Sequence, residues 1–127
     1  MIAKAQRKKT SQEEILNNLI IDAIQDIKGK NILKLDLGHL SDAPTSCFII
    51  CEGDSITQVR AISESINRKV RDTLELRPNH IEGLSSCKWV LVDYFDTIVH
   101  VFYPETREHY GLEELWSDAI FTEYENL

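Results

Sequence analysis

The sequence has no apolar run near the roughly 18 residues that a membrane-spanning helix requires. Its N-terminus is basic but lacks the apolar segment of a secretory signal peptide. The three cysteines cannot all pair within the chain, and two of them, Cys47 and Cys51, lie in an apolar run where buried thiols are common. We therefore expect a cytoplasmic protein with no membrane partner.

The common signatures of cofactor and metal binding are also missing. Neither a Walker A nor a GxGxxG motif occurs. The four histidines are scattered, and Cys47 and Cys51 share one strand face without a matching pair elsewhere. We predict no metal, no cofactor and no catalytic residue.

Charge is unevenly distributed along the 127 residues. The chain totals −7, and four positive charges lie ahead of Thr10, so the remainder carries −11. An acidic body argues against general nucleic-acid binding, which usually needs a basic face. We expect a flexible basic tail over residues 1–10, a single domain over 11–121 and an acidic C-terminal tail over 122–127.

Apolar periodicity predicts two long helices, one over residues 11–28 and one that follows the capping pattern at Ser55 and ends before Pro78. Strands are predicted over residues 32–37, 47–51 and 80–82. The segment 47–51 is apolar throughout, which is typical of a central strand covered on both faces. We predict an α/β (α+β) fold, a mixed sheet of about five strands with helices mainly on one face.

The stretch from Trp89 to Phe102 alternates on a two-residue period and predicts a hairpin with a two-residue turn at Phe95–Asp96. Phe at the first turn position is unusual, because such turns need a positive φ there. With this turn, Trp89 opposes Phe102. One face then carries Val90, Val92, Tyr94, Thr97, Val99 and Val101, and the other carries Trp89, Leu91, Asp93, Ile98, His100 and Phe102.

The second hairpin face mixes rings with an acid and an imidazole. Asp93 and His100 are diagonal neighbours, close enough for a carboxylate–imidazole contact. Two interpretations remain open: the pair satisfies itself beneath the terminal helices, or the face is exposed and its rings anchor a partner. A general-base pair is a further alternative, although no nucleophile accompanies it. An exposed sheet face or edge is also compatible with a homodimer.

Three segments together resemble the Iojap-related family, the ribosomal silencing factors (RsfS). They are Trp89-Val-Leu-Val-Asp-Tyr94, the run Asp96-x-Ile-Val-His-Val-Phe102, and Glu105-Thr-Arg-Glu-x-Tyr-x-Leu-Glu-x-Leu-Trp116. Upstream, the resemblance includes Phe48-Ile-Ile-Cys51 with Gly53, and Glu82-Gly83, and it extends from about Asn18 to Ala119.

The resemblance implies a translation repressor that binds the large ribosomal subunit through its fourteenth protein and blocks joining of the small subunit. It implies a fold related to nucleotidyltransferases without their catalytic residues. An enzyme of that kind would need a Gly-Ser loop followed by carboxylates two apart on a strand. Gly53-Asp-Ser55 is followed by no such pair, which argues against this enzyme class. The alternative function is a nucleotidyltransferase-like enzyme or nucleotide-binding protein with Asp93 and His100 in its site.

The resemblance places the family's contact positions at Trp89 and Asp93, with neighbouring strand residues at the rim. Tyr110, Leu115 and Trp116 match motif positions whose role is contact or packing. Two residues depart from the family pattern: Phe95 replaces a usual Gly, and Ser46 replaces a usual Asp. The predicted partner-binding set is Trp89, Leu91, Asp93, Tyr94, His100 and Phe102.

Overall fold

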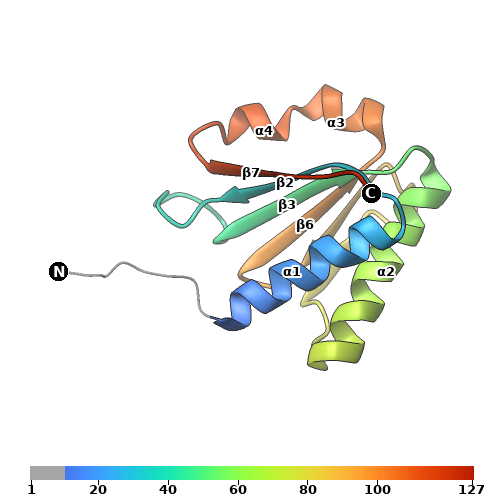
Figure 1. The fold of residues 1–127 in the computed structure, drawn as a ribbon. Coiled ribbons are helices and arrows are strands. Elements are labelled where there is room, and N and C mark those ends of the chain that lie inside the picture. The colour runs from blue at the N-terminus through green and yellow to red at the C-terminus, as the bar shows by residue number, and fades with distance from the viewer. Residues whose placement is uncertain (1–10) are drawn as a thin grey trace.

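A six-stranded mixed sheet forms the centre of the molecule in a computed structural model that describes residues 11–127 (Figure 1). The predicted basic tail over residues 1–10 lies outside the described residues. Only β3 and β6 pair in parallel, and every other neighbouring pair is antiparallel. The predicted mixed sheet is confirmed. The strands, in spatial order, are β4 (His80–Glu82), β5 (Trp89–Asp93), β6 (Thr97–Phe102), β3 (Cys47–Glu52), β2 (Lys30–Asp36) and β7 (Ile120–Tyr124).

Helices cover both faces of this sheet. The two long helices, α1 (Ser11–Asp26) and α2 (Ile56–Leu74), lie side by side on one face, and two short ones, α3 (Pro104–Tyr110) and α4 (Leu112–Leu115), lie on the other (Figure 1). The prediction of helices mainly on one face holds for the long pair only. The short pair covers a second, smaller core, which the sequence left open as one interpretation of the hairpin face.

The face under α1 and α2 is closed by aliphatic packing. Helix α2 begins with the predicted cap, in which the Ser55 hydroxyl accepts a hydrogen bond from the Gln58 amide at 3.0 Å. The Ser65 hydroxyl donates to the Ala23 carbonyl at 3.0 Å and joins the two helices. The buried side chains that these helices place over the sheet are Ile20, Ile24, Val59, Ile62, Ile66 and Val70, each at 0% exposure.

The opposite face holds a smaller core with aromatic side chains. Leu35 and Ile50 from the sheet and Leu112 from α4 are buried there, together with Phe48 and Phe102. Trp89 and Trp116 pack against this cluster and are only partly buried. Helices α3 and α4 therefore lie over β2, β3 and β6 on this face, and Tyr110 of α3 contacts Trp89 of β5.

Strand β7 overlaps the segment 122–127 that the sequence predicts as a tail. It pairs with β2 over five residue pairs, from Ile32–Tyr124 to Asp36–Ile120. The sheet therefore has six strands rather than about five, and ordered pairing extends to Tyr124, three residues into the predicted tail over 122–127. Four of the five β7 residues are exposed, so the strand had no buried apolar alternation to reveal it.

The β5–β6 hairpin follows the predicted register. Trp89 pairs with Phe102, Leu91 with His100 and Asp93 with Ile98. The Tyr94 amide donates to the Thr97 carbonyl at 2.8 Å, which closes a two-residue turn at Phe95–Asp96. Phe95 has a φ of +73° and is 69% exposed, so its ring points away from the core while its backbone takes the left-handed conformation.

Candidate functional site

Part of the aromatic face extends beyond the short helices. Trp89, Leu91 and Asp93 of β5 lie on this face, and each is partly exposed. On the neighbouring strand β4, Glu82 pairs with Leu91 and His80 pairs with Asp93, which places both on the same face. We call these five residues the open strip: Trp89, Leu91, Asp93, His80 and Glu82.

Trp89 is held by contacts with three side chains. Its ring stacks on Phe102 with centroids 4.9 Å apart and an interplanar angle of 29°, and Tyr110 contacts it at 4.9 Å. Its Nε1 donates a hydrogen bond to Nδ1 of His100 at 3.1 Å. The indole is therefore both partly exposed and fixed in orientation, which are the two properties of an anchoring side chain.

His100 lies beneath the open strip and is 4% exposed. Burial lowers the pKa of its imidazole from 6.5 to about 4, so the ring is neutral near pH 7. Because Nδ1 accepts the Trp89 hydrogen, the ring proton lies on Nε2. Phe48 packs edge-on against the ring at 4.6 Å. This imidazole is a fixed acceptor inside an aromatic cluster.

The predicted Asp93–His100 contact is wrong. The Asp93 Oδ1 accepts a hydrogen bond from the Phe95 amide at 2.7 Å, and His100 pairs with Trp89 instead. Asp93 stabilises the turn because its carboxylate caps a backbone amide two residues ahead. The general-base alternative depended on this pair, and the geometry gives it no support.

The six predicted binding residues divide into three groups. Trp89, Leu91 and Asp93 reach solvent. His100 and Phe102 lie on the same face but are buried beneath them. Tyr94 lies on the other face, under α1 and α2, and is 5% exposed; burial raises the pKa of its hydroxyl to about 12. Strand alternation already placed Tyr94 on the core face.

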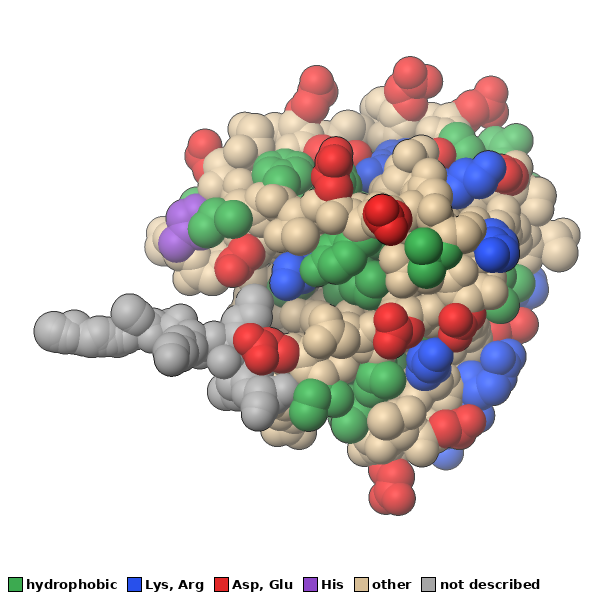
Figure 2. Space-filling view, in the orientation of Figure 1, with side chains coloured by type: hydrophobic (Ala, Val, Ile, Leu, Met, Phe, Trp, Pro, Cys, Tyr) green, Lys and Arg blue, Asp and Glu red, His purple; other side chains and the backbone are tan. Residues whose placement is uncertain are grey.

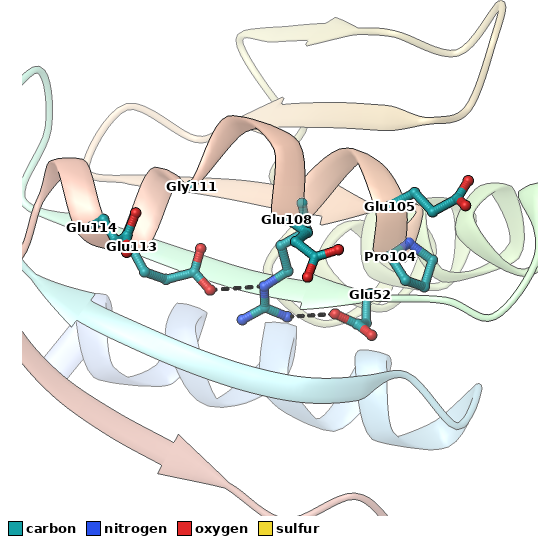
Figure 3. Close-up of a pocket in the computed structure, with 8 residues that line it drawn as sticks. Glu52, Pro104, Glu105, Glu108, Gly111, Glu113 and Glu114 are labelled. Carbon is teal, nitrogen blue, oxygen red and sulfur yellow. Dashed lines mark hydrogen bonds and ion pairs between the residues drawn. The ribbon is translucent and has the colours of Figure 1, made fainter.

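Arg107 is a buried residue of α3, outside the open strip, to which the sequence assigned no role. It is 8% exposed. Its Nε donates to Oε2 of Glu113 at 2.8 Å, and its Nη1 donates to Oε1 of Glu52 at 3.1 Å (Figure 3). The same Nη1 also donates to the Asn31 carbonyl at 2.8 Å. Its partners at Glu52 and Asn31 are 55 and 76 residues away, so no local pattern indicated them. Arg107 therefore links α3 and α4 to the N-terminal end of β2 and the C-terminal end of β3.

An acidic hollow of about 510 Å³ surrounds this arginine. On the face drawn in Figure 2, acidic side chains gather along the top, over α3 and α4. Residues 104–127 hold seven Asp or Glu and a single Lys or Arg, which is Arg107. The hollow is lined by Glu52, Pro104, Glu105, Arg107, Glu108, Gly111, Glu113 and Glu114 (Figure 3).

Within residues 11–127, no group of three or more His, Cys, Asp or Glu side chains is arranged to hold a metal ion. No helix in the same range is long and apolar enough to cross a membrane.

Comparison with known proteins identifies the family. Residues 8–127 match the family model described as ribosomal silencing factor during starvation. A ribosomal silencing factor RsfS from Halalkalibacterium halodurans is 35% identical over 117 residues, covering 92% of this chain and 97% of the relative. A mouse protein named mitochondrial assembly of ribosomal large subunit protein 1 is 33% identical over 80 residues, 61% of this chain and 35% of its own length.

A solved structure supports the same assignment. The crystal structure of a protein from Chromobacterium violaceum superimposes with a TM-score of 0.77 at 38% sequence identity, covering 86% of this chain and 88% of the other. Sequence and fold therefore agree across most of the chain, and the chain belongs to the ribosomal silencing factor (RsfS) family.

Proposed function

We propose that this protein represses translation in the cytoplasm by binding the large ribosomal subunit through its fourteenth protein, which blocks joining of the small subunit. Membership in a family of ribosomal silencing factors supports a ribosome-associated silencing role. The name of the mouse relative, mitochondrial assembly of ribosomal large subunit protein 1, supports the large subunit as the partner. The mechanism is steric occupation of a surface and requires no chemical step.

The observation that carries the proposal is the fixed, partly exposed Trp89 in the open strip. Aromatic side chains that are already held in one orientation lose little entropy on binding and are typical anchors of protein interfaces. Leu91 adds apolar area beside it, and Asp93 adds a negative charge. Tyr110, 57% exposed and in contact with Trp89, forms the rim toward α3.

The charge of the molecule favours a basic protein as the partner over bare nucleic acid. The chain carries −7, and Glu82 and Asp93 place carboxylates within the open strip. An acidic surface attracts a basic protein surface and speeds its encounter, whereas it repels the phosphate backbone of RNA. The contact therefore involves a ribosomal protein rather than direct readout of ribosomal RNA.

A homodimer is a second, compatible proposal, and the edge of β7 supports it. One side of β7 pairs with β2, and among residues 11–127 the other side joins no strand. Ile120 and Phe121 on this strand are 60% and 40% exposed. An uncovered edge with large apolar side chains can pair with the same edge of a second copy. Light scattering of the native protein and of Phe121→Lys tests this, and an unchanged mass for the variant contradicts it.

The experiment that tests the silencing role is sedimentation of the purified protein with isolated large subunits, followed by addition of small subunits. We expect the protein to co-sediment with the large subunit and to reduce the fraction of joined ribosomes. The control adds the protein to small subunits alone, where no co-sedimentation is expected. Absence of binding across a range of salt concentrations would overturn the proposal, and nucleotide binding with Mg²⁺ would then be the next measurement.

A further inference from the structure

Trp89 directs its single hydrogen-bond donor into the protein. The Nε1–H bonds to His100 at 3.1 Å, and the ring is flanked by Phe102 and Tyr110. An indole has no other polar hydrogen. A partner that contacts Trp89 therefore meets a ring whose one N–H is already bonded within the protein.

His100 is well placed to act as a rigid support. It lies on β6, an interior strand between β3 and β5, and is 4% exposed. Phe48 packs against its ring from β3 at 4.6 Å. Its other nitrogen, Nε2, is buried and has no hydrogen-bond partner within the described chain, so the bond to Trp89 is the one polar contact of this ring.

Packing against Phe48 and Phe102 does not by itself require an imidazole at position 100, because apolar side chains are the usual occupants of such a buried cluster. Burying an imidazole with one unpaired polar nitrogen costs stability relative to an apolar residue of similar size. Stability alone therefore does not explain the imidazole. Its one distinguishing feature is the acceptor that it presents to Trp89.

We propose that His100 is a positioning residue for the ribosome contact: it fixes the Trp89 indole so that the ring offers its carbon surface, and not its N–H, to the partner. This inference depends on the proposed function. It also defines the complementary group on the partner. An apolar side chain or the flat cation of an arginine suits a ring without a free donor, and Asp93 lies on the same strand face to pair with a cation.

Two substitutions separate positioning from packing. His100→Leu removes the acceptor and keeps an apolar side chain, whereas His100→Asn keeps an acceptor, Oδ1, at about the place of Nδ1. We expect His100→Leu to weaken large-subunit binding by about 10-fold or more and His100→Asn by about threefold at most. Thermal stability should follow the opposite order, because asparagine buries more unpaired polar surface.

A double-mutant cycle removes any general effect of the substitutions on folding. In a Trp89→Phe background the indole donor is absent, so His100→Leu should no longer reduce affinity beyond the single Trp89→Phe change. A binding-independent readout is the indole N–H resonance of Trp89 in a Trp116→Phe background. We expect His100→Leu to move this proton upfield and to speed its exchange with solvent, and His100→Asn to reverse both changes.

The outcomes are distinguishable. If the wild-type protein binds and His100→Leu binds equally well, the positioning role is overturned and the proposed function stands. If both substitutions weaken binding in proportion to their loss of stability, His100 is a packing residue and the inference is wrong. If the wild-type protein does not bind the large subunit, the proposed function itself fails, whatever the resonance shows.

Discussion

The two faces of the sheet differ in composition and in how completely they are covered. The face under α1 and α2 is aliphatic, and its central residues are at 0% exposure. The other face combines phenylalanine, tryptophan and histidine rings, and short helices cover only part of it. Hydrophobic burial is greatest where the cover is complete, so most of the stability comes from the first face. We propose that recognition uses the second face, where Trp89 is partly exposed and is fixed by its contacts with Phe102, Tyr110 and His100.

The two covers are also attached differently. Helices α1 and α2 pack on the sheet mainly through apolar contacts, with one buried hydrogen bond from the Thr97 hydroxyl to Asn17 Oδ1 at 2.6 Å. Helices α3 and α4 are held by Leu112 in the core and by the ion pairs of Arg107 to Glu52 and Glu113. We propose that the partner contacts the part of this face that the short helices leave uncovered.

The largest effect on stability is expected on the aliphatic face. Ile62 is fully buried, so Ile62→Ala should lower the free energy of unfolding by about 4 kcal/mol through lost burial and a cavity. Ile15→Ala, at a 47% exposed position of α1, is the matched control and should cost less than about 0.5 kcal/mol. Urea denaturation measures both. Equal losses would contradict the assignment of stability to this face.

Removing the arginine that ties down the short helices should have the next largest effect. Arg107→Ala leaves Glu52 and Glu113 partly buried without their cation, and we expect a loss of about 3 kcal/mol. Hydrogen exchange should rise first in α3 and α4, because these helices lose their attachment. Arg68→Ala, exposed on α2, is the control. Uniform exchange across all helices after Arg107→Ala would show that the cover is not a separate unit.

Acid should destabilise the protein through His100. Because its pKa is about 4 in the folded protein and 6.5 in the unfolded chain, only the unfolded state takes up this proton between these values. The stabilising contribution is complete above pH 6.5 and is lost as the pH falls toward 4, by about 2 to 3 kcal/mol. His100→Asn should remove this part of the slope when stability is measured from pH 7 to pH 4. An unchanged slope would contradict a neutral, buried imidazole.

The smallest effect on stability is expected at Asp93, where charge and turn capping can be separated. Asp93→Asn keeps an oxygen to accept from the Phe95 amide, so stability should change by less than about 0.5 kcal/mol while ribosome affinity falls several-fold. Asp93→Arg should reduce affinity further, by about 30-fold or more. Glu64→Arg, exposed on α2, makes the same reversal on the other side of the sheet and should leave affinity unchanged. A loss of affinity with Glu64→Arg equal to that with Asp93→Arg would point to overall charge alone.

Regular patterns of the sequence predicted much of the fold. The hairpin register and its turn at Phe95–Asp96 followed from strict alternation on both strands. The central strand β3 and the capped helix α2 followed from an apolar run and a Ser55-x-x-Gln58 pattern. These features depend on local sequence, which is why they were predictable.

The features that escaped prediction depend on contacts between distant segments. Strand β7 is mostly exposed, and its order comes from pairing with β2, some 90 residues earlier. Whether His100 contacts Asp93 or Trp89 depends on how the side chains are oriented within one face of the sheet. The alternation of residues along the strands does not determine this orientation. The family resemblance placed the contact positions at Trp89 and Asp93, on the hairpin face that alternation had assigned to them, whereas only the structure showed which predicted residues reach solvent.

The most direct test of the open strip as the contact surface compares two tryptophans that both lie on the aromatic face. Trp89 lies in the open strip, and Trp116 packs on Phe48 beside α4. Trp89→Ala and Trp116→Ala each remove one indole from the aromatic face, and large-subunit affinity is measured at a temperature where both variants are folded. We predict a loss of about 30-fold or more for Trp89→Ala and of threefold at most for Trp116→Ala. Equal losses, or a larger loss for Trp116→Ala, would contradict the open strip as the contact surface.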